Sequence, residues 1–163
     1  MKLWEDILAD RKVGVFGAAG TGKTFLIRAM VPYLQKLPKF QDPGSLVVVA
    51  ATNTAAKTFG ELCFGTMHSF FGVDLLELTV HEHVANIRNN VVIKKRILRA
   101  TLVIVLEFFS LPDITKLSEI LKVVRASTDF MGGLGLLPEG DFLQLPNPST
   151  QEFVFHIHVV LYR

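Results

Sequence analysis

Short apolar runs separate the polar stretches of this chain, and five of them have the length expected of buried strands. The β-branched runs Leu46–Ala51 and Thr101–Leu106 are the clearest, because continuous apolar runs of this kind are typical of strands covered on both faces. Pro138 directly follows another run and predicts that this strand ends early, with Glu139 exposed beyond it. The five predicted strands are Val13–Phe16, Leu46–Ala51, Thr101–Leu106, Leu134–Leu137 and Phe153–Leu161.

Between these runs, apolar residues recur at helical spacing. In Ile114–Arg125 they fall three and four positions apart, so one face of a helix is apolar and faces the core. Strands that alternate with helices predict an α/β fold with a mostly parallel sheet flanked by helices, and 163 residues are the size of one domain. Further helices are expected over residues 3–10, Thr24–Leu37, Thr54–Cys63, Val80–Asn89 and Val91–Ala100.

Composition sets limits on this α/β prediction. Half of the residues are hydrophobic and the mean hydropathy is +0.39, yet no run approaches the roughly 18 apolar residues of a membrane-spanning helix. The net charge of +2 permits nucleic-acid binding without indicating it. The basic stretch Arg88–Arg99 fits either a solvated helix face or a phosphate-contacting patch. The single cysteine, Cys63, excludes an internal disulfide and fits a reducing compartment, so we expect an intracellular protein without a membrane partner.

The first candidate for chemistry is the segment Gly17–Thr24, which reads GAAGTGKT and matches the phosphate-binding pattern G-x-x-x-x-G-K-[ST] at every fixed position. Glycines let the backbone curl so that its amides surround a polyanion, and the following helix presents its positive end. Lys23 supplies a charge for the β- and γ-phosphates, and Thr24 supplies a hydroxyl for Mg²⁺. The predicted contacts of a bound nucleotide are Gly17, Ala18, Ala19, Gly20, Thr21, Gly22, Lys23 and Thr24.

Two further strings stand downstream, TMHSFFG at Thr66–Gly72 and GDFLQLP at Gly140–Pro146. Together with GAAGTGKT, they resemble the motifs of the Pif/RecD-type DNA helicases of superfamily one, in that family's order and rough spacing. The resemblance extends from about Val13 to Phe155, which is nearly the whole chain. It implies a RecA-like P-loop NTPase domain that binds ATP, Mg²⁺ and single-stranded DNA, and a 5′-to-3′ helicase activity.

The resemblance also implies roles for individual residues. Lys23 and Thr24 would hold ATP and Mg²⁺. Gln144 would sense the γ-phosphate, and Asp141 would help to couple the nucleotide site to the DNA-binding face. Two interpretations of Phe70 stay open: its ring either stacks on a base or packs in the core. The residues that the resemblance places near single-stranded DNA are Thr52, His68, Ser69 and Phe70.

The chain departs from this family at the second motif, where the family has Asp-Glu, then a small apolar residue and serine. Alignment on Ser110 puts Glu107 at the metal-binding Asp position and Phe108 at the position of the catalytic Glu. A one-residue shift puts Glu107 at the catalytic position and Leu106 at the metal position, so one carboxylate is missing either way. Loss of a positioned general base typically costs about 10²–10⁴ in rate. Glu107 is therefore predicted either as the carboxylate for Mg²⁺ or as the catalytic carboxylate, a choice that the two alignments leave open, and hydrolysis is expected to be slow.

We expect a segment of an ATP-dependent DNA helicase in which one RecA-like domain covers residues 1–163. Motors of this superfamily close on ATP with a second RecA-like domain that supplies arginine residues, which contribute about 10³–10⁵ in rate in related phosphoryl-transfer enzymes. The chain alone is therefore expected to bind nucleotide weakly without unwinding DNA, and a second domain or chain is an expected partner. Two alternatives stay open: a non-catalytic nucleotide- or DNA-binding module, and another P-loop enzyme such as a small kinase.

Overall fold

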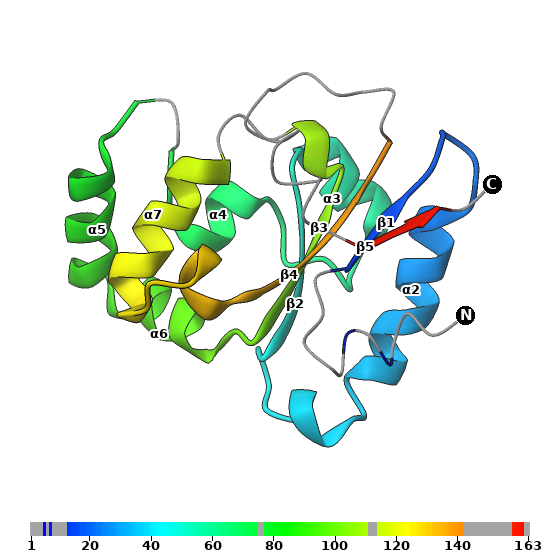
Figure 1. Cartoon of the computed structure of the whole chain (residues 1–163), viewed down its shortest axis with the longest axis horizontal. Helices are drawn as coiled ribbons and strands as arrows, with labels where there is room; N and C mark the ends of the chain where they lie inside the picture. Colours follow the sequence, from blue (N-terminus) through cyan, green and yellow to red (C-terminus); the bar gives the residue numbers. More distant parts are fainter. Residues whose placement is uncertain are drawn as a thin grey trace.

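The computed structural model describes Glu5, Ile7 and residues 13–74, 77–110, 114–141 and 158–161. Its strands form a sheet in the order β2-β3-β4-β1-β5, and every pair of neighbours is parallel (Figure 1). The predicted α/β fold with a mostly parallel sheet is therefore confirmed. The strands are β1 (Val13–Phe16), β2 (Leu46–Ala50), β3 (Leu102–Leu106), β4 (Gly135–Gly140) and β5 (His158–Leu161).

The predicted helices that lie in the described residues are present, with small shifts of their ends. α2 and α3 end a few residues earlier than predicted, and the short helix α4 is one that the apolar pattern missed. Within the described ranges, no helix is long and apolar enough to cross a bilayer. The helices are α2 (Lys23–Leu34), α3 (Asn53–Phe59), α4 (Met67–Phe71), α5 (Val80–Asn89), α6 (Val91–Arg99) and α7 (Ile114–Arg125), with 3₁₀ turns η1 (Pro38–Phe40), η2 (Phe108–Ser110) and η3 (Phe130–Gly133).

Helices cover both faces of the sheet, so the molecule has three layers (Figure 1). Neighbouring residues of β2 point to opposite faces: Val47 and Val49 belong to one apolar cluster, and Leu46 and Val48 belong to the other. The first cluster includes residues of α4, α5, α6 and α7, whereas the second includes residues of α2 and α3. Both faces of the strands are buried, which explains why their sequences are apolar without alternation.

Arg125, at the end of α7, ties three neighbouring segments together. Its Nη1 donates hydrogen bonds to the carbonyl oxygens of Ile97 (2.6 Å) and Ala100 (3.1 Å), and its Nε donates to the carbonyl oxygen of Gly132 (2.9 Å). Gly132 has a φ of +62°, and a Cβ at this position would collide with the carbonyl oxygen of Leu121. These contacts hold the ends of α6 and α7 against η3, from which the chain enters β4.

Strand β4 corrects one expectation. It continues through Pro138 to Gly140, so it does not end early. Pro138 is the last residue of β4 that pairs with β3, and Glu139 is the first that pairs with β1. The proline, which has no N–H to donate, therefore stands where pairing with β3 ends. The prediction of an exposed Glu139 is also wrong, because only 4% of this residue's surface is accessible. A carboxylate therefore lies inside the edge of the sheet that faces the GAAGTGKT segment.

Candidate nucleotide site

The GAAGTGKT segment forms a tight loop between the end of β1 and the start of α2. Gly20 and Gly22 have φ values of +78° and +86°, a left-handed conformation that glycine adopts without strain. A Cβ at either position would meet no atom within 4 Å, so the backbone conformation, and not a lack of space, requires glycine. No side chain caps the start of α2, so no side chain competes for its first-turn amides. The Gly17 amide donates to the carbonyl oxygen of Gly140 (3.2 Å), which ties the loop to β4.

Lys23 folds back over this loop. Its Nζ donates hydrogen bonds to the carbonyl oxygens of Gly17 (2.8 Å) and Ala18 (2.9 Å) and lies 4.0 Å from Oε1 of Glu139. The lysine side chain is 10% exposed. The ammonium group thus lies inside the curled loop, and two carbonyl oxygens and one carboxylate surround it.

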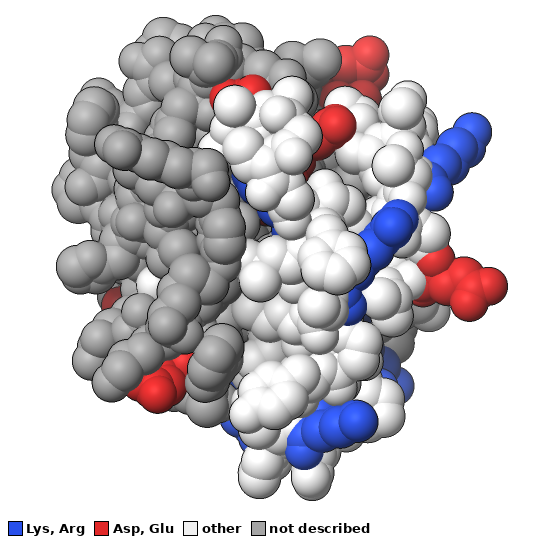
Figure 2. All heavy atoms as spheres, turned by 90° about the vertical axis from the view of Figure 1, so that its right-hand side faces the viewer, with Lys and Arg blue, Asp and Glu red and all other residues white. Residues whose placement is uncertain are grey.

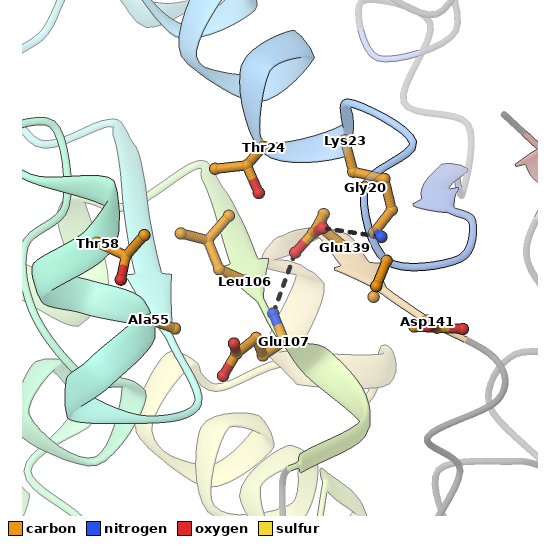
Figure 3. Close-up of a pocket in the computed structure, with 11 residues that line it drawn as sticks. Gly20, Lys23, Thr24, Ala55, Thr58, Leu106, Glu107, Glu139 and Asp141 are labelled. Atoms are coloured by element: carbon orange, nitrogen blue, oxygen red, sulfur yellow. Dashed lines mark hydrogen bonds and ion pairs between the residues drawn. The ribbon is translucent and has the colours of Figure 1, made fainter.

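A pocket opens beside the loop, and residues from the carboxyl ends of β3 and β4 line it (Figure 3). Thr24 contributes a hydroxyl, and Glu107, Glu139 and Asp141 contribute carboxyl groups. Within the described ranges, no three His, Cys, Asp or Glu side chains are placed to hold a metal ion by themselves. A Mg²⁺ ion here needs phosphate oxygens as further ligands, which is how Mg²⁺ usually binds in nucleotide sites. The lining residues are Ala19, Gly20, Lys23, Thr24, Ala55, Thr58, Leu106, Glu107, Glu139, Gly140 and Asp141.

The two residues at the centre of the second motif have different surroundings, since Glu107 lines the pocket and Phe108 belongs to an apolar core cluster. Glu107 follows β3 with a φ of +54°, and its Oε2 accepts a hydrogen bond from the hydroxyl of Thr52 (2.8 Å). Phe108 is fully buried, and its ring contacts that of Phe109 edge-on at 5.8 Å. Phe108 is therefore part of the core, and its position gives the pocket no polar group.

Glu139 lies between the second motif and the loop, with one contact to each. Its Oε2 accepts a hydrogen bond from the backbone amide of Glu107 (3.2 Å), and its Oε1 faces the ammonium group of Lys23 at 4.0 Å (Figure 3). Burial raises the pKa of this carboxyl above its ordinary value, although the Glu107 amide and the Lys23 charge act in the opposite direction. Local sequence patterns do not reveal this residue, because its burial depends on the pairing of β4 with β1 and β3.

The residues that the resemblance places near DNA are divided between two helix starts. The Thr52 hydroxyl caps α3 by accepting from the Ala55 amide (3.1 Å). On α4, His68 is half-buried and Ser69 is exposed. Phe70 is 1% exposed. Its ring therefore packs in the core and offers no free face to a base.

An exposed aromatic ring next to Phe70 is one that sequence reasoning missed. Phe64 is 48% exposed and meets Phe70 edge-on at 5.2 Å. The Arg96 guanidinium lies over both rings, 4.7 Å from the centre of Phe64 and 5.1 Å from that of Phe70. Its Nη2 also donates to the Ser69 carbonyl oxygen (2.9 Å). Part of the basic stretch Arg88–Arg99 is thus packed against α4.

The remaining predicted site residues fall in three groups. Ala19, Lys23 and Thr24 line the pocket together with Asp141. The Thr21 hydroxyl donates to the carbonyl oxygen of Ala18 (2.8 Å), so these two residues shape the loop. Gln144 lies outside the described residues, and its predicted γ-phosphate contact stays a prediction.

Comparison with known proteins gives a consistent result. The family model for PIF1-like helicases matches residues 7–154. The ATP-dependent DNA helicase PIF1 of Emericella nidulans is 36% identical over 133 residues, which cover 80% of this chain and 17% of that protein. The ATP-dependent DNA helicase RRM3 of Saccharomyces cerevisiae is 30% identical over 155 residues, which cover 90% of this chain and 20% of that protein. This chain therefore spans a fifth or less of the length of these curated relatives.

Solved structures agree with the sequence relatives. The crystal structure of Pif1 helicase from Candida albicans matches 98% of this chain and 38% of its own, with a TM-score of 0.80 and 27% identity. A Bacteroides Pif1 structure in complex with ADP-AlF4 shares the fold, with a TM-score of 0.72, 24% identity, and coverage of 99% of this chain and 40% of that one. The resemblance to Pif/RecD-type helicases is confirmed by the family model, which covers most of the chain. This chain belongs to the PIF1-like helicase family.

Proposed function

We propose that this chain is the nucleotide-binding RecA-like part of an ATP-dependent 5′-to-3′ DNA helicase. The observation that carries the proposal is the Gly17–Thr24 loop, which curls between β1 and α2 with Lys23 folded inside it. A second RecA-like domain, in the same polypeptide or in another, would complete the motor. Family membership does not favour a small kinase or another unrelated P-loop enzyme.

In this proposal a bound triphosphate would replace the loop carbonyl oxygens that now accept hydrogen bonds from Lys23. The ammonium group would exchange the carbonyl oxygens of Gly17 and Ala18 for β- and γ-phosphate oxygens, and the loop amides and the positive end of α2 would bind the same phosphates. The exposed Thr24 hydroxyl and the carboxyl groups of the pocket are hard oxygen donors, which fit Mg²⁺. When bound, Mg²⁺ would neutralise charge on the phosphates.

We place single-stranded DNA at the surface formed by α4 and the segment before it. The exposed Ser69, the half-buried His68 and the exposed ring of Phe64 all belong to this surface. Phe64, not Phe70, is the ring that we propose to stack on a base, a contact that contributes roughly 1–3 kcal/mol. On the opposite side, around α2, Lys and Arg side chains stand apart from one another over the described surface and form no continuous patch there (Figure 2).

Binding of a fluorescent ATP analogue tests the nucleotide site. We expect the wild-type chain to bind, and Lys23→Ala to weaken binding about tenfold or more, because a hydrogen bond to a charged group contributes about 1.5–3 kcal/mol. Lys122→Ala is the matched control, since Lys122 forms an exposed ion pair with Glu119 on α7. Equal affinity for the wild type and Lys23→Ala would refute the proposed site.

A further inference from the structure

The pocket beside the loop contains two glutamates whose carboxyl groups are engaged differently. The Glu107 carboxylate accepts from the Thr52 hydroxyl at the start of α3 (2.8 Å). The Glu139 carboxylate lies between Lys23 and the backbone of Glu107, in the interior of the pocket (Figure 3). Glu107, which alignment on Ser110 assigns to Mg²⁺, is thus held toward α3, whereas Glu139, which neither alignment assigns, faces the phosphate loop.

We propose that Glu139 supplies the carboxylate for the Mg²⁺ ion of a bound nucleotide, next to the Thr24 hydroxyl and in place of Glu107. This inference rests on the proposed function, since it requires a Mg²⁺-nucleotide in this pocket. It concerns which carboxylate of this chain meets the metal, and it gives Glu139 a role that neither the P-loop pattern nor the damaged second motif provides.

The position of Glu139 in the sheet supports this assignment. It pairs in register with Val15 of β1, and the next residue of β4, Gly140, pairs with Phe16. The loop begins directly after Phe16, so the carboxylate stands at the level where the phosphate-binding segment leaves the sheet. Thr24 lines the same pocket one residue after Lys23. A hydroxyl and a carboxylate on one side of a phosphate site are a donor pair that Mg²⁺ binds in nucleotide enzymes.

Charge compensation gives a second, independent reason. Glu139 is 4% exposed, and its charged partner is Lys23, whose Nζ lies 4.0 Å from Oε1. When Lys23 turns to the phosphates, this buried carboxylate loses its counter-ion. A buried carboxylate without a partner is costly, and the nucleotide adds more negative charge nearby. A divalent cation held by Glu139 next to the phosphates would remove both penalties, because Mg²⁺ is typically bound by one or two carboxylates together with phosphate oxygens.

The burial of the phenylalanine that follows Glu107 limits what the second motif can offer to a metal ion. Phe108 is fully buried against Phe109, so a carboxylate from the second motif has to come from Glu107 alone. The Glu107 side chain is committed to Thr52, and the backbone amide of Glu107 orients Glu139. In this arrangement Glu107 is a positioning residue that orients Glu139, and the Glu139 carboxylate is the proposed ligand of Mg²⁺.

The test measures how much Mg²⁺ strengthens nucleotide binding, which does not require hydrolysis. A fluorescent ATP analogue is titrated into the purified chain with excess Mg²⁺ and again with EDTA, and the ratio of the two dissociation constants is the readout. Glu139→Gln keeps the size of the side chain and an oxygen that accepts from the Glu107 amide. Glu107→Gln likewise keeps an oxygen for Thr52, and Glu119→Gln, on the exposed face of α7, is the charge-matched control.

We expect Glu139→Gln to reduce the Mg²⁺ enhancement roughly tenfold or more, since lost metal-site interactions commonly cost 10–100-fold in affinity. Its affinity in EDTA should stay equal or rise, because a negative charge near the phosphates is removed. Glu119→Gln should keep the wild-type enhancement, and Glu107→Gln should reduce it much less than Glu139→Gln does. Electron paramagnetic resonance with Mn²⁺ and ATP gives a direct measure of the metal, and Glu139→Gln should leave more Mn²⁺ free.

Two results would overturn the inference: a wild-type enhancement in Glu139→Gln, or its loss in Glu107→Gln with Glu139→Gln unaffected. Circular dichroism checks the fold of each variant. Should Glu139→Gln not fold, Glu139→Asp replaces it, and an unchanged enhancement in Glu139→Asp would count against Glu139, because the carboxylate is one methylene shorter. Failure of the wild type to bind the analogue in either buffer would refute the proposed function itself, and so the two failures are distinguishable.

Discussion

Replacing Phe108 with glutamate would put back the side chain that alignment on Ser110 gives the family at this position, and we expect the change to unfold the protein and not to activate it. Phe108 is fully buried, and its ring meets Phe109 edge-on at 5.8 Å. Phe109 in turn contacts the ring of Phe16 at 5.3 Å. The new carboxylate would therefore enter the aromatic core on the α7 side of the sheet and not the pocket.

The expected loss of stability is large compared with the total. Removal of a buried phenylalanine side chain costs about 3–5 kcal/mol. A carboxyl group in the same site would take up a proton instead of staying charged, and a rise of about 2–3 units in its pKa would cost about 3–4 kcal/mol at neutral pH. The combined loss is about 6 kcal/mol or more, against a total stability of about 5–15 kcal/mol for a domain of this size.

Urea unfolding followed by circular dichroism measures this effect. Phe108→Met is the control, and it should lose only about 1–2 kcal/mol because it replaces one large apolar side chain with another. Phe108→Glu should be unfolded or close to its midpoint in buffer without urea, with no gain in ATP hydrolysis. A folded Phe108→Glu variant that stays within about 2 kcal/mol of the wild type and hydrolyses ATP faster would show that this side chain reaches the pocket, and the assignment of Phe108 to the core would then be wrong.

Three further predictions concern the supports of the site. Arg125→Lys should lower the free energy of unfolding by about 2–3 kcal/mol, because lysine cannot reach three carbonyl oxygens on two segments. Thermal melts should show this loss of stability. The control Lys122→Ala should change the free energy of unfolding by no more than about 0.5 kcal/mol. Gly132→Ala should cost at least about 2 kcal/mol, from its left-handed backbone and the clash with α7. Gly133 also has a left-handed φ, of +75°, but a Cβ there would make only ordinary contacts, so Gly133→Ala should lose less stability. Equal losses of stability in the two variants would argue against the clash at Gly132. Burial raises the pKa of Glu139 in the folded state above its ordinary value, so the wild type should lose stability relative to Glu139→Gln as the pH rises from that ordinary value through the folded pKa. Urea midpoints of both proteins at several pH values would contradict this if their difference stayed constant.

The parts of the molecule that sequence alone could predict are those whose cause is local. Val13–Phe16 and Leu46–Ala50 are strands because continuous apolar runs suit a sheet covered on both sides. The loop at Gly17–Thr24 could be predicted because its glycines and its lysine are adjacent along the chain. These features needed no knowledge of which elements meet in space.

The parts that sequence could not predict depend on tertiary pairing. The burial of Glu139 follows from the register of β4 with β1 and β3, and a proline beside it pointed to the opposite conclusion. Phe64 and Phe70 are both aromatic and lie close together, yet one ring is 48% exposed and the other 1%. Arg96, from a helix more than twenty residues downstream, lies over both rings, and no pattern around either phenylalanine indicates that contact.

The contacts of Glu107 link the two surfaces that the proposed motor would use. Its carboxylate binds the Thr52 hydroxyl, at the start of a helix that the family resemblance places near DNA, and its amide binds Glu139, which faces Lys23. Movement of Lys23 toward a phosphate changes the electrostatic environment of Glu139 directly, and Glu139 is held to the same residue that holds Thr52. Glu107 therefore joins Glu139 to the start of α3, through a contact of its backbone and a contact of its side chain.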